Sequence, residues 1–105
     1  MNLQDIRNSF KSATKNEYWH HLMMKNDQGK DFYFKNKSSI DSRIQEIGRD
    51  SLERKDAKFG LTPLHVATIA GNKPGLQFLL RQKVSRTQID NDQKTAQDYA
   101  QKFTP

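Results

Sequence analysis

The most constraining feature of this sequence is a close set of helix start and stop signals in its second half. Thr62 is a favoured N-cap residue, and Pro63 follows at the first helical position, where a missing N–H costs nothing. Gly71 is a favoured residue for ending a helix, two turns later. This spacing predicts two short consecutive helices, Thr62–Ala70 and Pro74–Gln82. The apolar residues predicted to pack these helices together are Leu64, Ala67, Leu76, Leu79 and Leu80.

The segment that begins at Gly60 resembles the ankyrin repeat. Its Thr-Pro-Leu-His-x-Ala signature is matched in full at residues 62–67, and apolar residues follow at the right distance in the second helix. The resemblance covers 57–82, continues more weakly through 83–103, and extends to a degenerate first unit over 38–56; residues 1–37 lie outside it. It implies a stack of helix pairs that carries no chemistry of its own and binds protein partners through a concave surface of turns and first helices.

The repeat period provides a second test of the resemblance. Adding 33 to Thr62 leads to Thr95, and the following helix then aligns with the first helix of the repeat. Three positions depart from the pattern: Gln93 stands where a turn glycine is usual, Gln97 replaces Leu64, and Asp98 replaces His65. The chain reaches Pro105 before any second helix, so this segment is interpreted as a polar half-repeat that caps the stack.

Length and composition predict one domain with a thin core. Leu, Ile, Val and Phe make up 22 of the 105 residues. One and a half repeats do not bury a core alone, since three or more are usually needed. The predicted fold is therefore all-α, a short ankyrin-like stack of helix pairs in a single domain. Residues 1–56 form an N-terminal helical and aromatic cap that includes the degenerate unit, 57–90 the repeat, and 91–105 the capping half-repeat.

Two further helices are predicted within the N-terminal cap. Residues 2–14 place Leu3, Ile6, Phe10 and Ala13 on one face of a helix. Residues 38–48 carry an isoleucine stripe and end at a glycine, which is a good helix stop. The charged and polar residues 49–57 that follow are interpreted as a solvated connection.

Residues 17–35 leave two alternatives open. A turn signal at 26–29 separates a segment rich in large side chains from the aromatic run Phe32–Phe34, which favours a β-hairpin. In the alternative, 16–25 is helical and the aromatic run is irregular. Poor helical periodicity over 17–25 favours the hairpin.

Composition also excludes several classes of protein. No apolar run approaches the 18 or so residues needed to cross a bilayer, and residues 1–10 lack the apolar region of a secretory signal. The chain has no cysteine, which suits a reducing compartment. We therefore expect no membrane association and a cytoplasmic location, or the cytoplasm of a host if the chain is a microbial effector.

Candidate catalytic and metal-binding residues have simpler explanations. The resemblance implies that His65 forms hydrogen bonds with the Thr62 hydroxyl and nearby backbone and links neighbouring units. His20 and His21 are adjacent, so in a strand they point to opposite faces and do not share a metal. No phosphate loop, nucleophile motif or acid pair stands out. We expect no enzyme activity, metal, cofactor or small-molecule substrate.

A partner-binding patch is predicted at positions that face outward in the resemblance. Apolar Phe59, Leu61 and Ile69 stand where repeats usually show polar residues, with Lys58 and Lys94 at the rim. They form either a hydrophobic contact site for a protein partner or a surface covered by the chain's own aromatic residues. The residues that would cover them are Trp19, Tyr33 or Phe34.

The sequence leaves two other functions open. The net charge of +6 and four N-terminal aromatic residues suggest a binder of nucleic acid or of an anionic surface. The charge is spread evenly along the chain and interleaved with acids, which argues against it. Self-association through an open end of the stack is the other alternative. The aromatic residues in question are Tyr18, Trp19, Phe32 and Tyr33.

Overall fold

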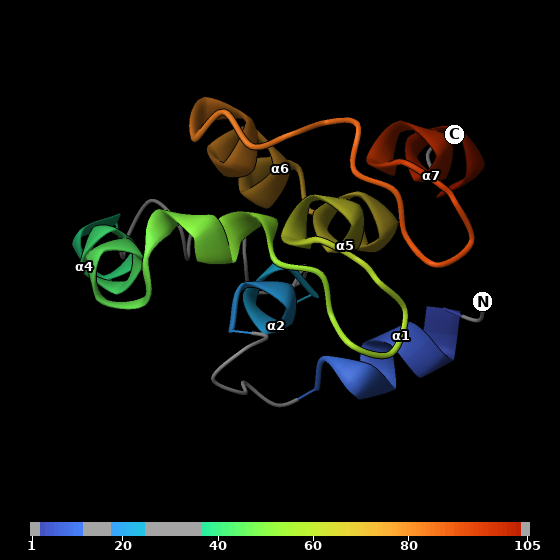
Figure 1. The fold of residues 1–105 in the computed structure, drawn as a ribbon, viewed down its shortest axis with the longest axis horizontal. Helices are drawn as coiled ribbons and strands as arrows, with labels where there is room; N and C mark the ends of the chain where they lie inside the picture. Colours follow the sequence, from blue (N-terminus) through green and yellow to red (C-terminus); the bar gives the residue numbers. More distant parts are fainter. Residues whose placement is uncertain (1–2, 12–17, 25–36, 104–105) are drawn as a thin grey trace.

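The computed structural model describes residues 3–11, 18–24 and 37–103 (Figure 1). All regular secondary structure in these ranges is helical, which confirms the all-α prediction at that level. The elements are α1 (Leu3–Ser9), α2 (Tyr18–Met24), α4 (Lys37–Ile47), the 3₁₀ helix η1 (Arg49–Glu53), α5 (Pro63–Ala70), α6 (Lys73–Arg81) and α7 (Ala96–Phe103).

Helix α5 is the centre of the molecule. It packs against α2 on one side and α7 on another, and α6 and η1 also contact it (Figure 1). Because neighbours surround it, every residue from Pro63 to Ile69 is buried. The apolar side chains of α1, α2, η1, α5, α6 and α7 form one continuous core.

The signals that bound α5 and α6 act as the sequence predicts. Thr62 caps α5 in extended conformation, and Gly71 ends it in the left-handed region at φ 69°. Asn72 then caps α6, because its side-chain Oδ1 accepts a hydrogen bond from the Gly75 N–H at 3.0 Å. Pro74 lies in the first turn of α6, as expected.

The N-terminal segment differs from the prediction in one respect. Residues 18–24 form helix α2, so a β-hairpin with its first arm there is wrong; the second arm, Phe32–Phe34, lies outside the described residues. The helix is favoured because it buries Trp19, Leu22 and Met23 in the core, which local periodicity did not reveal. Helix α1 spans a shorter range than the predicted 2–14 but buries Ile6 as expected.

The interpretation of residues 49–57 as a solvated connection holds only in part, for the exposed residues Arg49, Asp50, Arg54, Lys55 and Ala57. Ser51 and Leu52 of η1 are buried, and so is Asp56. The buried indole Nε1 of Trp19 donates to Ser51 Oγ at 2.7 Å, and Ser51 Oγ donates to the Gly48 carbonyl at 2.6 Å. This relay fastens η1 to α2, which explains why so polar a segment lies partly inside.

Candidate functional site

Two turns, at residues 56–61 and 90–94, precede α5 and α7. The Asp56 carboxylate builds the first by accepting from the N–H groups of Lys58, Phe59 and Leu61 at 3.0, 2.9 and 2.7 Å. Gly60 takes φ 72°, a conformation that side chains disfavour. A buried aspartate thus replaces regular secondary structure in holding this backbone.

The second turn is built in the same way. Asp90 Oδ1 accepts from the N–H groups of Asp92 and Lys94, both at 2.9 Å, and Oδ2 accepts from the Tyr99 hydroxyl. Burial and the Asp90 carboxylate raise the pKa of Tyr99, so its hydroxyl stays protonated and remains a donor. Gln93 lies 33 residues after Gly60 and also has a positive φ, of 61°.

The two turns lie directly against each other. The Asn91 N–H donates to the Phe59 carbonyl at 3.0 Å, and its side-chain amide donates to the Lys58 carbonyl at 3.1 Å. A Cβ on Gly60 would lie 2.5 Å from Asn91 Oδ1 and 3.0 Å from the Asn91 backbone N, so a side chain there would displace Asn91 from this contact. The exposed tips of both turns therefore form one surface with fixed spacing.

The helices that follow the turns begin with equivalent contacts. Thr62 N–H donates to His65 Nδ1 at 3.1 Å, and His65 N–H donates back to Thr62 Oγ1 at 3.4 Å. Before α7, Thr95 N–H donates to Asp98 Oδ2 at 2.9 Å and Asp98 N–H donates to Thr95 Oγ1 at 3.3 Å. Asp98 therefore does at position 98 what the histidine does at 65. The Thr95 N–H and the Thr95 hydroxyl both donate to Asp98 Oδ2, and these two bonds lower the pKa of Asp98.

Two buried histidines connect successive layers. His65 Nε2 donates to the Lys94 carbonyl at 2.9 Å, and His20 Nε2 donates to the Leu61 carbonyl at 2.6 Å. Leu61 and Lys94 are the residues immediately before Thr62 and Thr95, 33 positions apart. Burial lowers the pKa of both rings, which keeps them neutral at pH 7.

The structure divides the predicted binding patch. Lys58 and Lys94 are exposed, and Phe59 is half-buried, with the Lys58 Nζ 5.1 Å from the centre of its ring. Leu61 and Ile69 are only 0% and 5% exposed, so an exposed apolar patch that includes them is wrong. They belong to the core that α1 and α2 complete, and the chain itself covers them.

One of the aromatic residues that suggested nucleic-acid binding, Trp19, lies in the core. Trp19 is buried and packs near Phe78, with ring centroids 6.1 Å apart. Tyr18 is partly buried, and the Arg43 guanidinium lies 4.9 Å from the centre of its ring. Phe32 and Tyr33 lie outside the described residues.

Sequence reasoning missed the residues that shape this surface. Asp56, Asp90 and Asn91 were not singled out, although an aspartate shortly before a turn residue is a known signal for side-chain-to-backbone bonding. That signal indicates a turn, but it does not show that two turns lie in contact. The pairing of Asn91 with Lys58 depends on the packing of α5 against α7.

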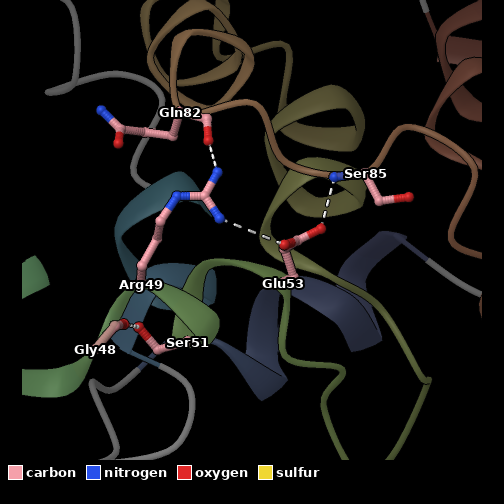
Figure 2. Close-up of polar contacts among 6 residues, drawn as sticks. All are labelled: Gly48, Arg49, Ser51, Glu53, Gln82 and Ser85. Atoms are coloured by element: carbon pink, nitrogen blue, oxygen red, sulfur yellow. Dashed lines mark hydrogen bonds and ion pairs between the residues drawn. The ribbon is translucent and has the colours of Figure 1, made fainter.

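A second polar cluster lies between η1 and the segment after α6 (Figure 2). The Arg49 guanidinium donates to the Gln82 carbonyl and lies 3.8 Å from the Glu53 carboxylate. Glu53 in turn accepts from the Ser85 N–H at 2.6 Å. These contacts fasten η1 to the segment after α6 and occupy both charged groups, so we assign the cluster a structural role (Figure 2).

Comparison with known proteins adds no relative. No protein-family profile matches the sequence, and no curated protein or solved structure shows a significant match. Within the described ranges, no group of three or more His, Asp or Glu side chains is placed to hold a metal ion. No helix of the described part has the length and apolar character needed to cross a membrane.

Proposed function

We propose that this chain is a non-catalytic protein-interaction module built as a short ankyrin-type stack. The observation that carries the proposal is the recurrence, after 33 residues, of a turn with positive φ, a threonine cap and a carbonyl bonded to a histidine ring. Such recurrence is expected when identical units stack, because each unit meets its neighbour through the same atoms.

The stack in this proposal has three members. Helices α5 and α6 make the complete unit, and α7 is the capping half-unit. Helices α2 and α4 make the degenerate first unit, because His20 of α2 contacts the turn before α5 as His65 contacts the turn before α7. The contact of Arg43 in α4 with the Tyr18 ring supports pairing these two helices.

The binding surface in this proposal is the paired turns. Lys58, Phe59 and Lys94 remain from the predicted patch, while Leu61 and Ile69 support it from the core. A rigid surface held by backbone hydrogen bonds loses little conformational entropy on binding, which favours recognition of a protein partner. An adaptor, an inhibitor or an effector would each use such a surface, without catalysis and without a cofactor.

Obstruction of the turn tip tests the proposal. Ala57 is exposed at the tip of the first turn, and Gln77 is exposed on α6. We expect Ala57→Tyr to abolish capture of a protein partner from the native host, identified by mass spectrometry, and Gln77→Tyr to leave it intact. Equal capture by both variants would contradict the proposed surface.

Two further measurements address the alternatives. Tight binding of single-stranded RNA or DNA that weakens steeply with salt would favour the nucleic-acid function instead. Sedimentation over a range of concentrations would reveal self-association through an end of the stack.

A further inference from the structure

Three exposed lysines lie around the paired turns. Lys55 and Lys58 belong to the first turn region and Lys94 to the second, and we call these three residues the basic turn cluster. The two ion pairs found among the described residues, Arg43–Glu46 and Arg49–Glu53, involve none of them.

Four carboxylates lie in the paired turns and the start of α7, and two of them, Asp56 and Asp90, point inward while Asp92 and Asp98 are exposed. Asp56 and Asp90 are each 5% exposed and accept hydrogen bonds from the turns' own N–H groups. The backbone N–H groups stabilise these two buried charges, and at the surface the three exposed lysines outnumber the two exposed carboxylates, Asp92 and Asp98. The even distribution of charge along the sequence hides this separation, because it counts buried and exposed carboxylates alike.

The fold also sets where these cations lie. The carbonyl of Lys58 accepts from the Asn91 side chain, and the carbonyl of Lys94 accepts from His65 Nε2. Lys55 directly precedes Asp56, whose carboxylate holds the first turn, so the backbone of all three lysines belongs to the paired turns or adjoins them. Fixed backbone positions reduce the entropy lost when several cations engage one ligand.

An apolar contact accompanies the charges. The Phe59 ring is half-buried beside the Lys58 ammonium, whose Nζ lies 5.1 Å from the ring centre. The surface therefore offers a half-buried aromatic ring beside an exposed cation, and aromatic residues are enriched at protein interfaces.

We propose that the basic turn cluster binds an acidic segment of a partner protein, with Lys55, Lys58 and Lys94 contacting its carboxylates and Phe59 packing on an adjacent side chain. This inference rests on the proposed function and adds the chemical class of the partner. Discrete carboxylates suit the surface better than a continuous phosphate backbone does, because exposed Asp92 and Asp98 flank Lys94 in the sequence and leave no uninterrupted run of cations.

Charge reversal at matched positions tests the inference. The site variant Lys55→Glu/Lys58→Glu/Lys94→Glu changes the net charge by the same amount as the control variant Lys73→Glu/Arg81→Glu/Lys83→Glu. All six side chains are exposed. The probe is a fluorescein-labelled glutamate-rich peptide, and binding to the full chain is measured by fluorescence anisotropy at low and at physiological salt.

We expect the site variant to lose about tenfold or more of the peptide affinity and the control variant to lose about threefold or less. Equal losses in both variants would overturn the inference, since net charge alone would then explain binding. So would unchanged affinity in the site variant, or a labelled oligonucleotide that binds more tightly than the peptide and depends on the same lysines. If the site variant melts lower than wild type, the glutamine triple variant replaces it and is held to the same expectation.

The two proposals fail separately. If a captured host protein is lost in Ala57→Tyr but retained in the charge-reversal variant, the turns bind a partner that is not acidic. That result would leave the proposed function standing and overturn this inference.

Discussion

His20 and His65 hold equivalent positions in two successive layers of the fold. The Nε2 atom of each ring donates to the carbonyl of the residue just before a helix cap, Leu61 for His20 and Lys94 for His65. Their Nδ1 atoms differ, because His65 Nδ1 accepts from the Thr62 N–H whereas His20 Nδ1 has no hydrogen-bond partner among the described residues. Both rings must stay neutral to keep these bonds without a buried charge.

The first prediction is a loss of stability in mild acid. Burial lowers the pKa of both histidines from the usual value of 6.5. As pH falls below about 6.5, the unfolded chain binds protons that the folded chain does not, so stability is kept above that pH and lost below it. We expect the melting temperature to fall between about pH 7.5 and pH 5, by roughly 4–8 °C for each kcal/mol lost.

The double variant His20→Gln/His65→Gln serves as the comparison for this pH dependence. Its melting temperature should be lower at neutral pH but should change less over the same range, because glutamine does not titrate. A wild-type melting temperature that is flat from about pH 7.5 to pH 5 would contradict the role assigned to these rings.

The second prediction concerns the residues of the predicted patch. Leu61→Ala should cost about 2–4 kcal/mol of unfolding free energy, because it leaves a cavity in the core. Phe59→Ala should cost less, since that ring is half-buried, and Lys58→Ala should melt as wild type does. Chemical denaturation of the three variants checks this order. A Leu61→Ala protein as stable as wild type would show that Leu61 lies at the surface.

The third prediction concerns the relay that joins α2 to η1. Ser51→Ala leaves the buried Trp19 Nε1–H without its acceptor and should cost about 1–3 kcal/mol. In a double-mutant cycle with Trp19→Phe, the double variant should lose about 0.5–1.5 kcal/mol less unfolding free energy than the sum of the losses in the two single variants. Ser42→Ala on the exposed side of α4 is the control. Strict additivity in the cycle would mean that the two residues do not interact.

The fourth prediction compares the two threonine caps. Thr95→Ala at the half-exposed start of α7 should cost about 1 kcal/mol, as at an ordinary cap. Each hydroxyl also contacts the side chain three residues later, Thr62 Oγ1 at 2.7 Å from His65 Nδ1 and Thr95 Oγ1 at 3.1 Å from Asp98 Oδ2. Thr62→Ala should cost more, because Thr62 is buried and the groups left without a partner there are shielded from water. Thermal melts of both variants measure the difference, and a larger effect at Thr95 would reverse the ranking of the two helix starts.

The fifth prediction is that residues 57–105 do not fold alone. Removing the N-terminal segment uncovers Leu61, Leu64 and Ile69, which the core shares with α1 and α2. The remaining helices α5, α6 and α7 then bury too little apolar surface to offset the entropy of ordering. A two-dimensional amide NMR spectrum of the fragment should show narrow dispersion. Wide dispersion would show that the C-terminal part is an independent unit.

Local sequence signals determined the elements around α5. The cap at Thr62, the stop at Gly71 and the start of α6 follow from residues within one or two turns of each other, because their energies come from backbone bonds to nearby side chains. The 33-residue offset also located the start of α7, where Asp98 takes over the role of a histidine. The function that this resemblance implies stays a prediction.

Tertiary packing decided the rest. The sequence left α2 between helix and strand, and the choice depends on core space for Trp19 and Met23 that other segments create. Whether Leu61 and Ile69 faced a partner or the chain itself was equally open, because burial depends on a helix about 40 residues earlier. Asp56 and Asp90 likewise point inward, because the N–H groups of the turns have no partner in regular secondary structure and bond to these carboxylates instead. The lysines of the turns are left facing solvent.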